Sequence, residues 1–373
     1  MRIFLFFIIL TCYQFASCQS KFGIDFIIGA TDESVISTEK DSVISILKDY
    51  HRFIISDPGY VNGYWDSTVL KNNPLPDYML KQELSRYKDY DFKFNLILLF
   101  KKDNVWIAQI GYNLFKNNEF KGLCCVYNFA ITNRAGKIKL TPIIDTYSYS
   151  VISDSTVSLK CFHPLIARKG DFDSLSNFNI KLSKIFKVDK KRVNCYKFQN
   201  FSETNRRLGL DVQYYSIYKT DNAYCDYYNN NIYGSNSDVF IHELTHLYTN
   251  QIYLNCHRWF DEGFAAYLGG SLGYSLNTLL QSLKVDLKKN SDYDLSNLLS
   301  YGYKKTTTNT SYLLILGGLF CKIMYEKEGY EGVFKLLKVS NESNAEFYSA
   351  IEKYIGVKQE NLNEFLRKEL EKY

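Results

Sequence analysis

A His-Glu-x-x-His motif from His242 to His246 constrains this chain more than any other segment. Residues four apart lie on one face of an α-helix, so a helix there would aim both imidazoles at one point. Glu243 lies one residue round from that face, close enough to reach a water molecule bound there. The motif therefore predicts a helix with two metal ligands, and apolar residues are available for its other side: Val239, Phe240, Leu244, Leu247 and Tyr248.

A second segment, Trp-Phe-Asp-Glu-Gly-Phe-Ala-Ala-Tyr over residues 259–267, follows closely and has the pattern of another amphipathic helix. Its Glu262 offers a carboxylate as a third ligand. Two His and one carboxylate leave a tetrahedral zinc ion with one open position, which is typical of catalytic zinc sites. Zinc suits this ligand set best, although cobalt or manganese would be tolerated. We therefore expect one zinc ion per chain.

Together the two motifs resemble those of the gluzincin metallopeptidases, and in particular the peptidase MA-like group. That group has the pattern Trp-x-x-Glu-Gly-x-Ala-x-Tyr, and its fixed positions are all present here: Trp259, Glu262, Gly263, Ala265 and Tyr267. The resemblance covers residues 160 to 373 and is specific only at the motifs. It implies a general base and three zinc ligands: Glu243, and His242, His246 and Glu262.

The chain departs from other zincin branches. Metzincins need Gly and then His where Thr249 and Ile252 stand. The orienting Asp of thermolysin-like enzymes, four residues after the Glu ligand, is replaced by Ala266. The Gly-x-Met-Glu-Asn segment of the aminopeptidase branch is absent, so exopeptidase specificity is unsupported. Three nearby residues remain alternative third ligands: Asp261, His257 and Cys256.

The residue types predict a mechanism. Zinc would act as a Lewis acid on water and on the substrate carbonyl, with Glu243 carrying the proton to the leaving amine. In gluzincins a downstream Tyr or His often stabilises the oxyanion, and Tyr312 is the best candidate, ahead of Tyr301 and Tyr303. In such enzymes a peptide substrate usually adds to an edge strand just before the zinc helix, so the resemblance implies a substrate strand within 223–234; an ordinary strand and turn is an equal interpretation.

Length and composition fit a globular protein of two domains: 373 residues, 46% hydrophobic and 23% charged. The net charge of +5 is spread without a basic run and does not suggest nucleic-acid binding. Residues 1–18 have the short basic start, apolar core and small residues of a signal peptide. Cleavage after Cys18 and lipidation of Cys18, as in a bacterial lipoprotein, are both open. We expect export to the periplasm, outer-membrane surface or exterior, and no transmembrane helix.

Seven cysteines follow residue 18, and this odd number leaves at least one thiol unpaired in an exported protein. Residues 19–155 are predicted to form an accessory α+β domain. A helix with apolar residues from Val43 to Ile54 precedes strands over 94–100, 105–114, 123–131 and 137–144. A helix before an antiparallel meander resembles the cone of nuclear-transport-factor-2-like domains. This domain could bind a ligand, position substrates or shield the peptidase.

Residues 156–373 are predicted to form the gluzincin-like domain, after a possible linker over 147–158. The fold class is α+β: a small mixed or antiparallel sheet, then a helical half with a zinc cleft between them. Helices are expected over 175–186, 202–208, 276–288, 311–326, 330–338, 345–355 and 361–371, with a strand over 212–218. Gly317-Gly318 within an apolar helix predicts close helix packing.

The prediction from these features is an exported zinc-dependent peptidase acting on a peptide or protein substrate. A non-catalytic binding protein with a structural zinc is the alternative; retention of Glu243 favours catalysis, because a structural site has no use for a base. A third interpretation is an adaptor lipoprotein that acts through its N-terminal domain.

Overall fold

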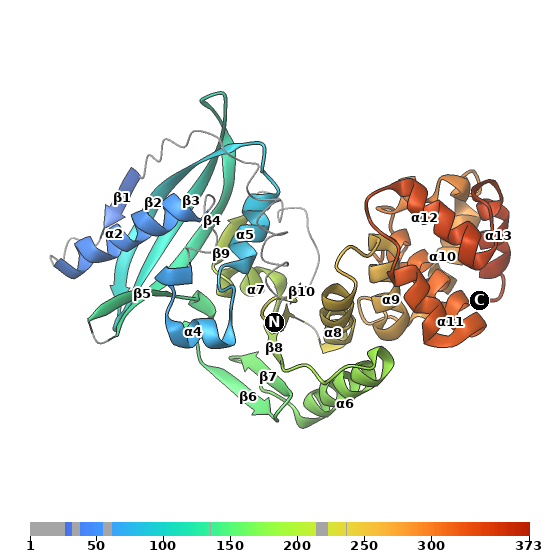
Figure 1. The fold of residues 1–373 in the computed structure, drawn as a ribbon, viewed down its shortest axis with the longest axis horizontal. Helices are drawn as coiled ribbons and strands as arrows, with labels where there is room; N and C mark the ends of the chain where they lie inside the picture. The colour runs from blue at the N-terminus through green and yellow to red at the C-terminus, as the bar shows by residue number, and fades with distance from the viewer. Residues whose placement is uncertain (1–26, 32–37, 55–61, 135, 214–222, 236) are drawn as a thin grey trace, which may run out of the picture. The chain divides into compact units, whose positions relative to one another are not determined.

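The computed structural model describes residues 27–31, 38–54, 62–134, 136–213, 223–235 and 237–373. The chain forms two compact units (Figure 1). The first comprises Met1–Ser148 with Phe201–Asp221, and the second Tyr149–Asn200 with Asn222–Tyr373. The expected signal peptide and Cys18 lie outside the described residues. Within the described ranges, no helix combines the length and apolarity needed to cross a membrane.

The first unit is a twisted sheet covered by helices, including α2 (Thr38–Phe53), which lies across the sheet in Figure 1. Its meander is β2 (Asp91–Lys102), β3 (Val105–Lys116), β4 (Glu119–Arg134) and β5 (Lys137–Thr141), with β1 (Ile27–Thr31) parallel to β2. The strand registers shift once between β2 and β3 and twice between β3 and β4, and irregularities of this kind bend a strand as β-bulges do. Two short helices not expected from the sequence are α4 (Ser67–Asn72) and α5 (Tyr78–Ser85).

The long strand β4 is shared by two neighbours on one edge. β5 pairs with residues 130–134, and β9 (Leu210–Gln213) pairs with residues 125–127. The preceding helix α7 (Phe201–Arg207) matches the helix expected over 202–208. The expected strand over 212–218 is described only up to Gln213. Strand β9 comes after the expected linker in the sequence, yet it pairs with β4 of the first sheet.

The interior of the first unit holds a buried histidine, His51, whose ring nitrogens lie 2.6 Å from the Leu47 carbonyl oxygen and 2.8 Å from the Tyr112 hydroxyl. The side chains of Phe94 and Phe129 contact the ring. Burial lowers the pKa of His51 from 6.5 to about 4, although the Leu47 carbonyl raises it slightly. The folded unit therefore favours the neutral imidazole.

We expect this histidine to make the first unit less stable in acid. The unfolded chain takes up the proton below pH 6.5 and the folded chain only near pH 4. The contribution of His51 to the free energy of unfolding is therefore complete above pH 6.5. It decreases by about 3 kcal/mol as the pH falls toward 4. Urea unfolding at pH 7, 5.5 and 4, followed by fluorescence of Trp65 and Trp106, measures the loss. His51→Gln should flatten this dependence; an unchanged slope in that variant would contradict the assignment.

The second unit begins with a mixed five-stranded sheet in the order β10-β11-β8-β7-β6. Its strands are β6 (Tyr149–Ser153), β7 (Val157–Phe162), β8 (Val193–Lys197), β10 (Ala223–Asp226) and β11 (Asn231–Gly234). β7, β8 and β11 are parallel, while β6 and β10 are antiparallel at the two ends. Helix α6 (Lys169–Phe186) makes the crossover from β7 to β8.

The boundary between the two units, at Ser148 and Tyr149, falls within the linker expected over 147–158, but most of these residues form β6 and the start of β7. Tyr149, Val151 and Ile152 favour strand conformation. Between the two strands, the Asp154 carboxylate accepts hydrogen bonds from the backbone N–H groups of Thr156 at 2.6 Å and Val157 at 2.7 Å. This turn closes an antiparallel hairpin and explains the polar composition that resembled a linker.

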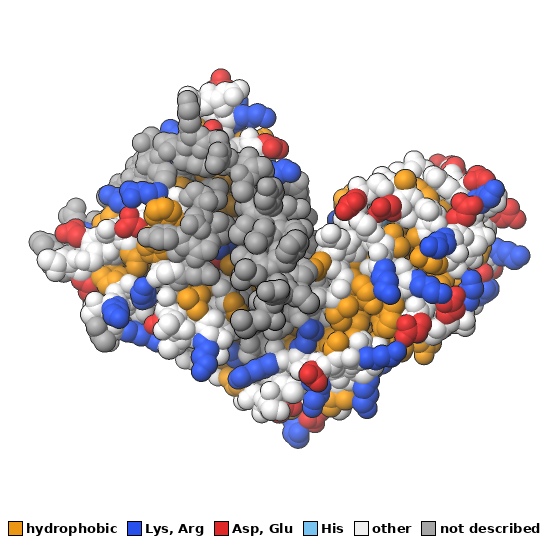
Figure 2. Space-filling model, viewed as in Figure 1, with side chains coloured by type: hydrophobic (Ala, Val, Ile, Leu, Met, Phe, Trp, Pro, Cys, Tyr) orange, Lys and Arg blue, Asp and Glu red, His pale blue; other side chains and the backbone are white. Residues whose placement is uncertain are grey.

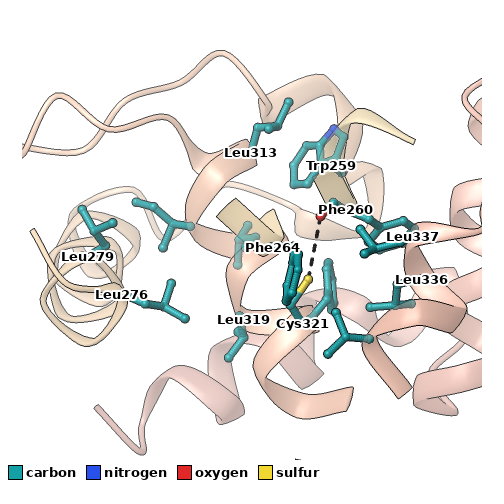
Figure 3. Close-up of a cluster of buried hydrophobic side chains, with 14 of the residues drawn as sticks. Trp259, Phe260, Phe264, Leu276, Leu279, Leu313, Leu319, Cys321, Leu336 and Leu337 are labelled. Atoms are coloured by element: carbon teal, nitrogen blue, oxygen red, sulfur yellow. Dashed lines mark hydrogen bonds between the residues drawn. The ribbon is translucent and has the colours of Figure 1, made fainter. Parts of the chain in front are cut away.

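The rest of the second unit is helical: α8 (Ser237–Ile252), α9 (Arg258–Gly269), α10 (Leu276–Lys289), α11 (Tyr312–Leu337), α12 (Asn344–Ala350) and α13 (Leu362–Leu370). The two helices expected over 311–326 and 330–338 form α11, which is kinked at Gly329 with φ +63°. Large apolar side chains of α9, α10 and α11 form the core that Figure 3 shows, around Phe260, Phe264 and Leu319. On the face in Figure 2, side chains of both charges are interspersed over this unit. The molecule is thus an α+β fold with two sheets and a helical half.

Candidate metal centre

Helix α8 carries the two motif histidines on one face, as the spacing predicts. The His242 and His246 rings lie 5.0 Å apart between centroids, and each residue is only 7% exposed. The opposite face of α8 packs into the core through four fully buried side chains: Phe240, Leu244, Leu247 and Tyr248. The Tyr248 hydroxyl also donates a hydrogen bond to the Asn179 side-chain oxygen on α6 at 2.6 Å.

Helix α9 brings a carboxylate to the same point. One oxygen of Glu262, Oε2, lies 3.3 Å from His242 Nε2 and 3.6 Å from His246 Nε2. The potential ligand atoms of these three residues all lie within 4.8 Å of one another. A group of side chains that could bind a metal ion therefore forms from two helices, with all three donors directed at one place.

Two glycines at the end of α9 allow it to approach α8. A Cβ on Gly269 would lie 2.7 Å from the backbone nitrogen of His242. The carbonyl oxygen of Gly270 lies 2.8 Å from His242 Nδ1. Gly270 has φ +70°, a left-handed conformation that favours glycine. His242 therefore donates Nδ1–H to this carbonyl, which leaves Nε2 as the atom that faces Glu262.

The electrostatics of the cluster favour positive charge. Burial opposes protonation of His246, but the carboxylates of Asp261 and Glu262 outweigh burial and raise the pKa of His246 well above its usual range. Burial likewise raises the pKa of Glu262, but hydrogen bonds from His242 and His246 hold it well below its usual range. A site that attracts a proton in this way would also attract a metal cation.

The donor set fits zinc. Zinc takes imidazole nitrogen and carboxylate oxygen in sites with three protein ligands. Each imidazole has an acceptor near its second nitrogen, as metal-ligating histidines almost always do. The geometry is therefore compatible with one zinc ion held by His242, His246 and Glu262.

The alternative third ligands lie elsewhere in the local structure. His257 is the N-cap of α9, where its Nδ1 accepts a hydrogen bond from the Trp259 N–H at 3.4 Å, and its ring packs on Phe347. Cys256 Sγ lies 3.5 Å from the His257 carbonyl oxygen. Asp261 contacts the second nitrogen of His246 and lies outside the ligand group found among the described residues.

Glu243 is half-buried on α8, between the two histidines in sequence. Strand β10 carries Cys225, and burial raises the pKa of its thiol. Helix α8, which carries Glu243, packs against this strand at the end of the sheet, where a substrate backbone is expected.

The structure gives Tyr312 a different partner from the three cluster residues. Its side chain is fully buried at the start of α11, and its hydroxyl donates a hydrogen bond to the Asp286 carboxylate on α10. Burial raises the pKa of Tyr312, and Asp286 raises it further. The Tyr301 ring lies 5.1 Å from the Tyr293 ring between centroids, in a tilted arrangement, and Tyr303 is 81% exposed. The oxyanion role remains a prediction for all three tyrosines.

The supporting residues around the histidines were missed from sequence. Thr249 and Asn250 both donate to the Asp261 carboxylate. The signal was present, since Thr249 and Asn250 are three and four residues after His246, on the same side of a helix. The sequence pattern indicates Asp261 only as an alternative third ligand, and it does not indicate Gly270 as the acceptor for His242.

No protein-family model and no curated protein matches this chain. Among solved structures, one match is the crystal structure of a mutant M1 zinc metallopeptidase from Deinococcus radiodurans. It has a TM-score of 0.32 and 11% sequence identity, and it covers 74% of this chain and 64% of that one, so this chain spans less than two thirds of its length. The assignment of the site therefore depends on the geometry described above.

Proposed function

We propose that this protein is a zinc-dependent peptidase of the gluzincin type. The observation that supports it is the approach of His242 Nε2, His246 Nε2 and Glu262 Oε2 to one point, with ligand atoms within 4.8 Å of one another. The sequence adds Glu243 next to the first ligand. Metal ligands together with a base are the minimum that metal-assisted hydrolysis of an amide requires.

In the proposed mechanism, His242, His246 and Glu262 would hold zinc, which would supply a Lewis acid for water and for the substrate carbonyl. Glu243 takes the proton from the attacking water and transfers it to the nitrogen of the leaving amine. The cleaved bond is the peptide C–N bond, and the products are a carboxylate and an amine. The Gly270 carbonyl oxygen accepts the Nδ1–H of His242, so Nε2 is the nitrogen of His242 that is available as a ligand.

The substrate would bind in extended form along β10. This strand is at the end of the sheet order, with β11 as its antiparallel neighbour, and α8 contacts both strands. A peptide can add to such an edge through backbone hydrogen bonds. The packing of α8 against β10 supports this position, because Glu243 lies on α8.

We also propose that the protein is exported, from the signal-peptide pattern of residues 1–18. The first unit would then be an accessory domain. N-terminal analysis of the exported protein tests this: a start at Gln19 supports cleavage, and an acylated Cys18 supports a lipoprotein. A mature chain that keeps Met1 would contradict export.

The test of the proposed function is metal content and peptide cleavage by residues 19–373. Mass spectrometry should find about one zinc per chain in the parent protein. Glu262→Ala should lose most of this zinc, since the site then keeps only two neutral imidazole ligands and no charged ligand. Casein cleavage should disappear with a chelator and return with zinc.

Three outcomes would contradict parts of this proposal. A parent protein without zinc would rule out the metal site. Zinc retained in Glu262→Ala would rule out the ligand assignment. Zinc lost in Glu262→Ala, but without cleavage of casein or of a peptide library by the parent, would favour a binding protein with a structural zinc.

A further inference from the structure

Asp261 is in contact with the second nitrogen of a proposed zinc ligand. Its Oδ2 lies 3.0 Å from His246 Nδ1, and the two side chains are 16% and 8% exposed. The contact is off the N–H axis, since Nδ1 makes no well-aligned hydrogen bond. The attraction between the carboxylate and the ring is therefore mainly electrostatic.

The Asp261 carboxylate is itself held in place from α8. The Thr249 hydroxyl donates to Oδ1, and the Asn250 amide donates to Oδ2 at 3.3 Å. Asp261 also lies in the first turn of α9, where the helix dipole stabilises negative charge. Two hydrogen bonds and the dipole of α9 therefore hold the Asp261 carboxylate against the His246 ring.

From this arrangement we infer that Asp261 is a positioning residue for the zinc site, an inference that rests on the proposed function. Its carboxylate keeps the His246 proton on Nδ1 and leaves the Nε2 lone pair for the metal. It also makes His246 a stronger electron donor than His242, whose Nδ1 faces the neutral Gly270 carbonyl at 2.8 Å.

This carboxylate lies at a different position in the sequence from the one expected from thermolysin-like enzymes. The place expected from thermolysin-like enzymes holds Ala266, which is fully buried in the core. Asp261 directly precedes the Glu262 ligand instead, so ligand and positioning residue share one turn of α9. The anchors Thr249 and Asn250 follow the His246 ligand on α8. Each helix therefore supplies both a ligand and part of its support.

The test is the zinc dissociation constant, measured by competition with a chromophoric chelator, for the parent and for Asp261→Asn. The Asn side chain has nearly the same shape but no charge. We expect zinc binding to weaken by about 10- to 100-fold. This loss should exceed the loss of stability of the metal-free protein, where the variant loses only the attraction between Asp261 and His246. Thr249→Val, which removes one anchor of the carboxylate, should weaken binding by less.

A matched control is Asp171→Asn. Asp171 is also an acid in the first turn of a helix, α6, and pairs with Lys197 at 3.1 Å. It should bind zinc as the parent does. The absorption spectrum of the cobalt-substituted protein gives a second readout, because a change in ligand field at His246 should shift it in Asp261→Asn but not in Asp171→Asn.

The outcomes separate this inference from the peptidase proposal. Zinc binding unchanged in Asp261→Asn would overturn the positioning role alone. Weaker binding with an equally destabilised metal-free protein would also overturn it, because Asp261 would then be only a link between helices. A parent that binds zinc with Asp261-dependent affinity, yet cleaves no peptide, would support this inference and contradict the peptidase. A parent without zinc would contradict both.

Discussion

Replacing Glu243 by Gln should lower the rate of peptide cleavage by about 10²- to 10⁴-fold while zinc content stays at that of the parent. The amide has the shape of the carboxylate but cannot take a proton from water. Glu243 is outside the ligand group formed by the two histidines and Glu262, so its loss should spare the metal. The measurement is kcat and KM on a peptide substrate, with zinc determined on the same samples.

The matched control is Glu364→Gln, which makes the same chemical change at an exposed position on α13. It should leave kcat and zinc content unchanged. If Glu243→Gln cleaves peptides within a few fold of the parent rate, the residue is not the base. If zinc is lost in proportion to activity, Glu243 acts through the metal site and the proton-transfer role is wrong.

A methyl group at Gly317 should destabilise the second unit by about 3 kcal/mol or more. A Cβ there would lie 2.1 Å from the carbonyl oxygen of Trp259 and 3.0 Å from the Cα atom of Gly263. Both are backbone atoms of α9 and cannot rotate away, so α9 and α11 would have to separate. Because Glu262 precedes Gly263, this displacement should also weaken zinc binding.

The neighbouring residue Gly318 offers a control on the same helix. A Cβ there would lie 2.7 Å from Cδ1 of Leu276, the end of a flexible side chain. Leu276 can adjust, so Gly318→Ala should cost about 1 kcal/mol. Differential scanning calorimetry of both variants measures the contrast. Equal melting temperatures for Gly317→Ala and Gly318→Ala would show that the backbone contact between α9 and α11 is not rigid.

The local features of the site could be predicted from the sequence. His242 and His246 lie on one face of α8 because a four-residue spacing has that consequence in any α-helix. Glu262 could be placed on a second helix from its amphipathic pattern and from the resemblance to gluzincins. The Gly317-Gly318 pair correctly predicted close packing, since residues without side chains in an apolar helix allow another backbone to approach.

Other features needed the tertiary structure. The hairpin of β6 and β7 within the expected linker could not be predicted, because the hydrogen bonds from backbone N–H groups to Asp154 are not visible in composition. The return of β9 to β4 depends on pairing between segments far apart in the chain. The contact of the Tyr312 hydroxyl with Asp286 depends on how α10 packs on α11.

The sequence by itself thus determined which residues can bind a metal and which helix faces carry them, because residue type and helical period are local properties. Only the tertiary structure decided that one Glu262 oxygen meets both Nε2 atoms and that Asp261 faces His246. It also decided that Gly270 accepts from His242. These contacts depend on the distance and angle between α8 and α9, which the packing of many buried side chains sets together, so no single motif encodes them.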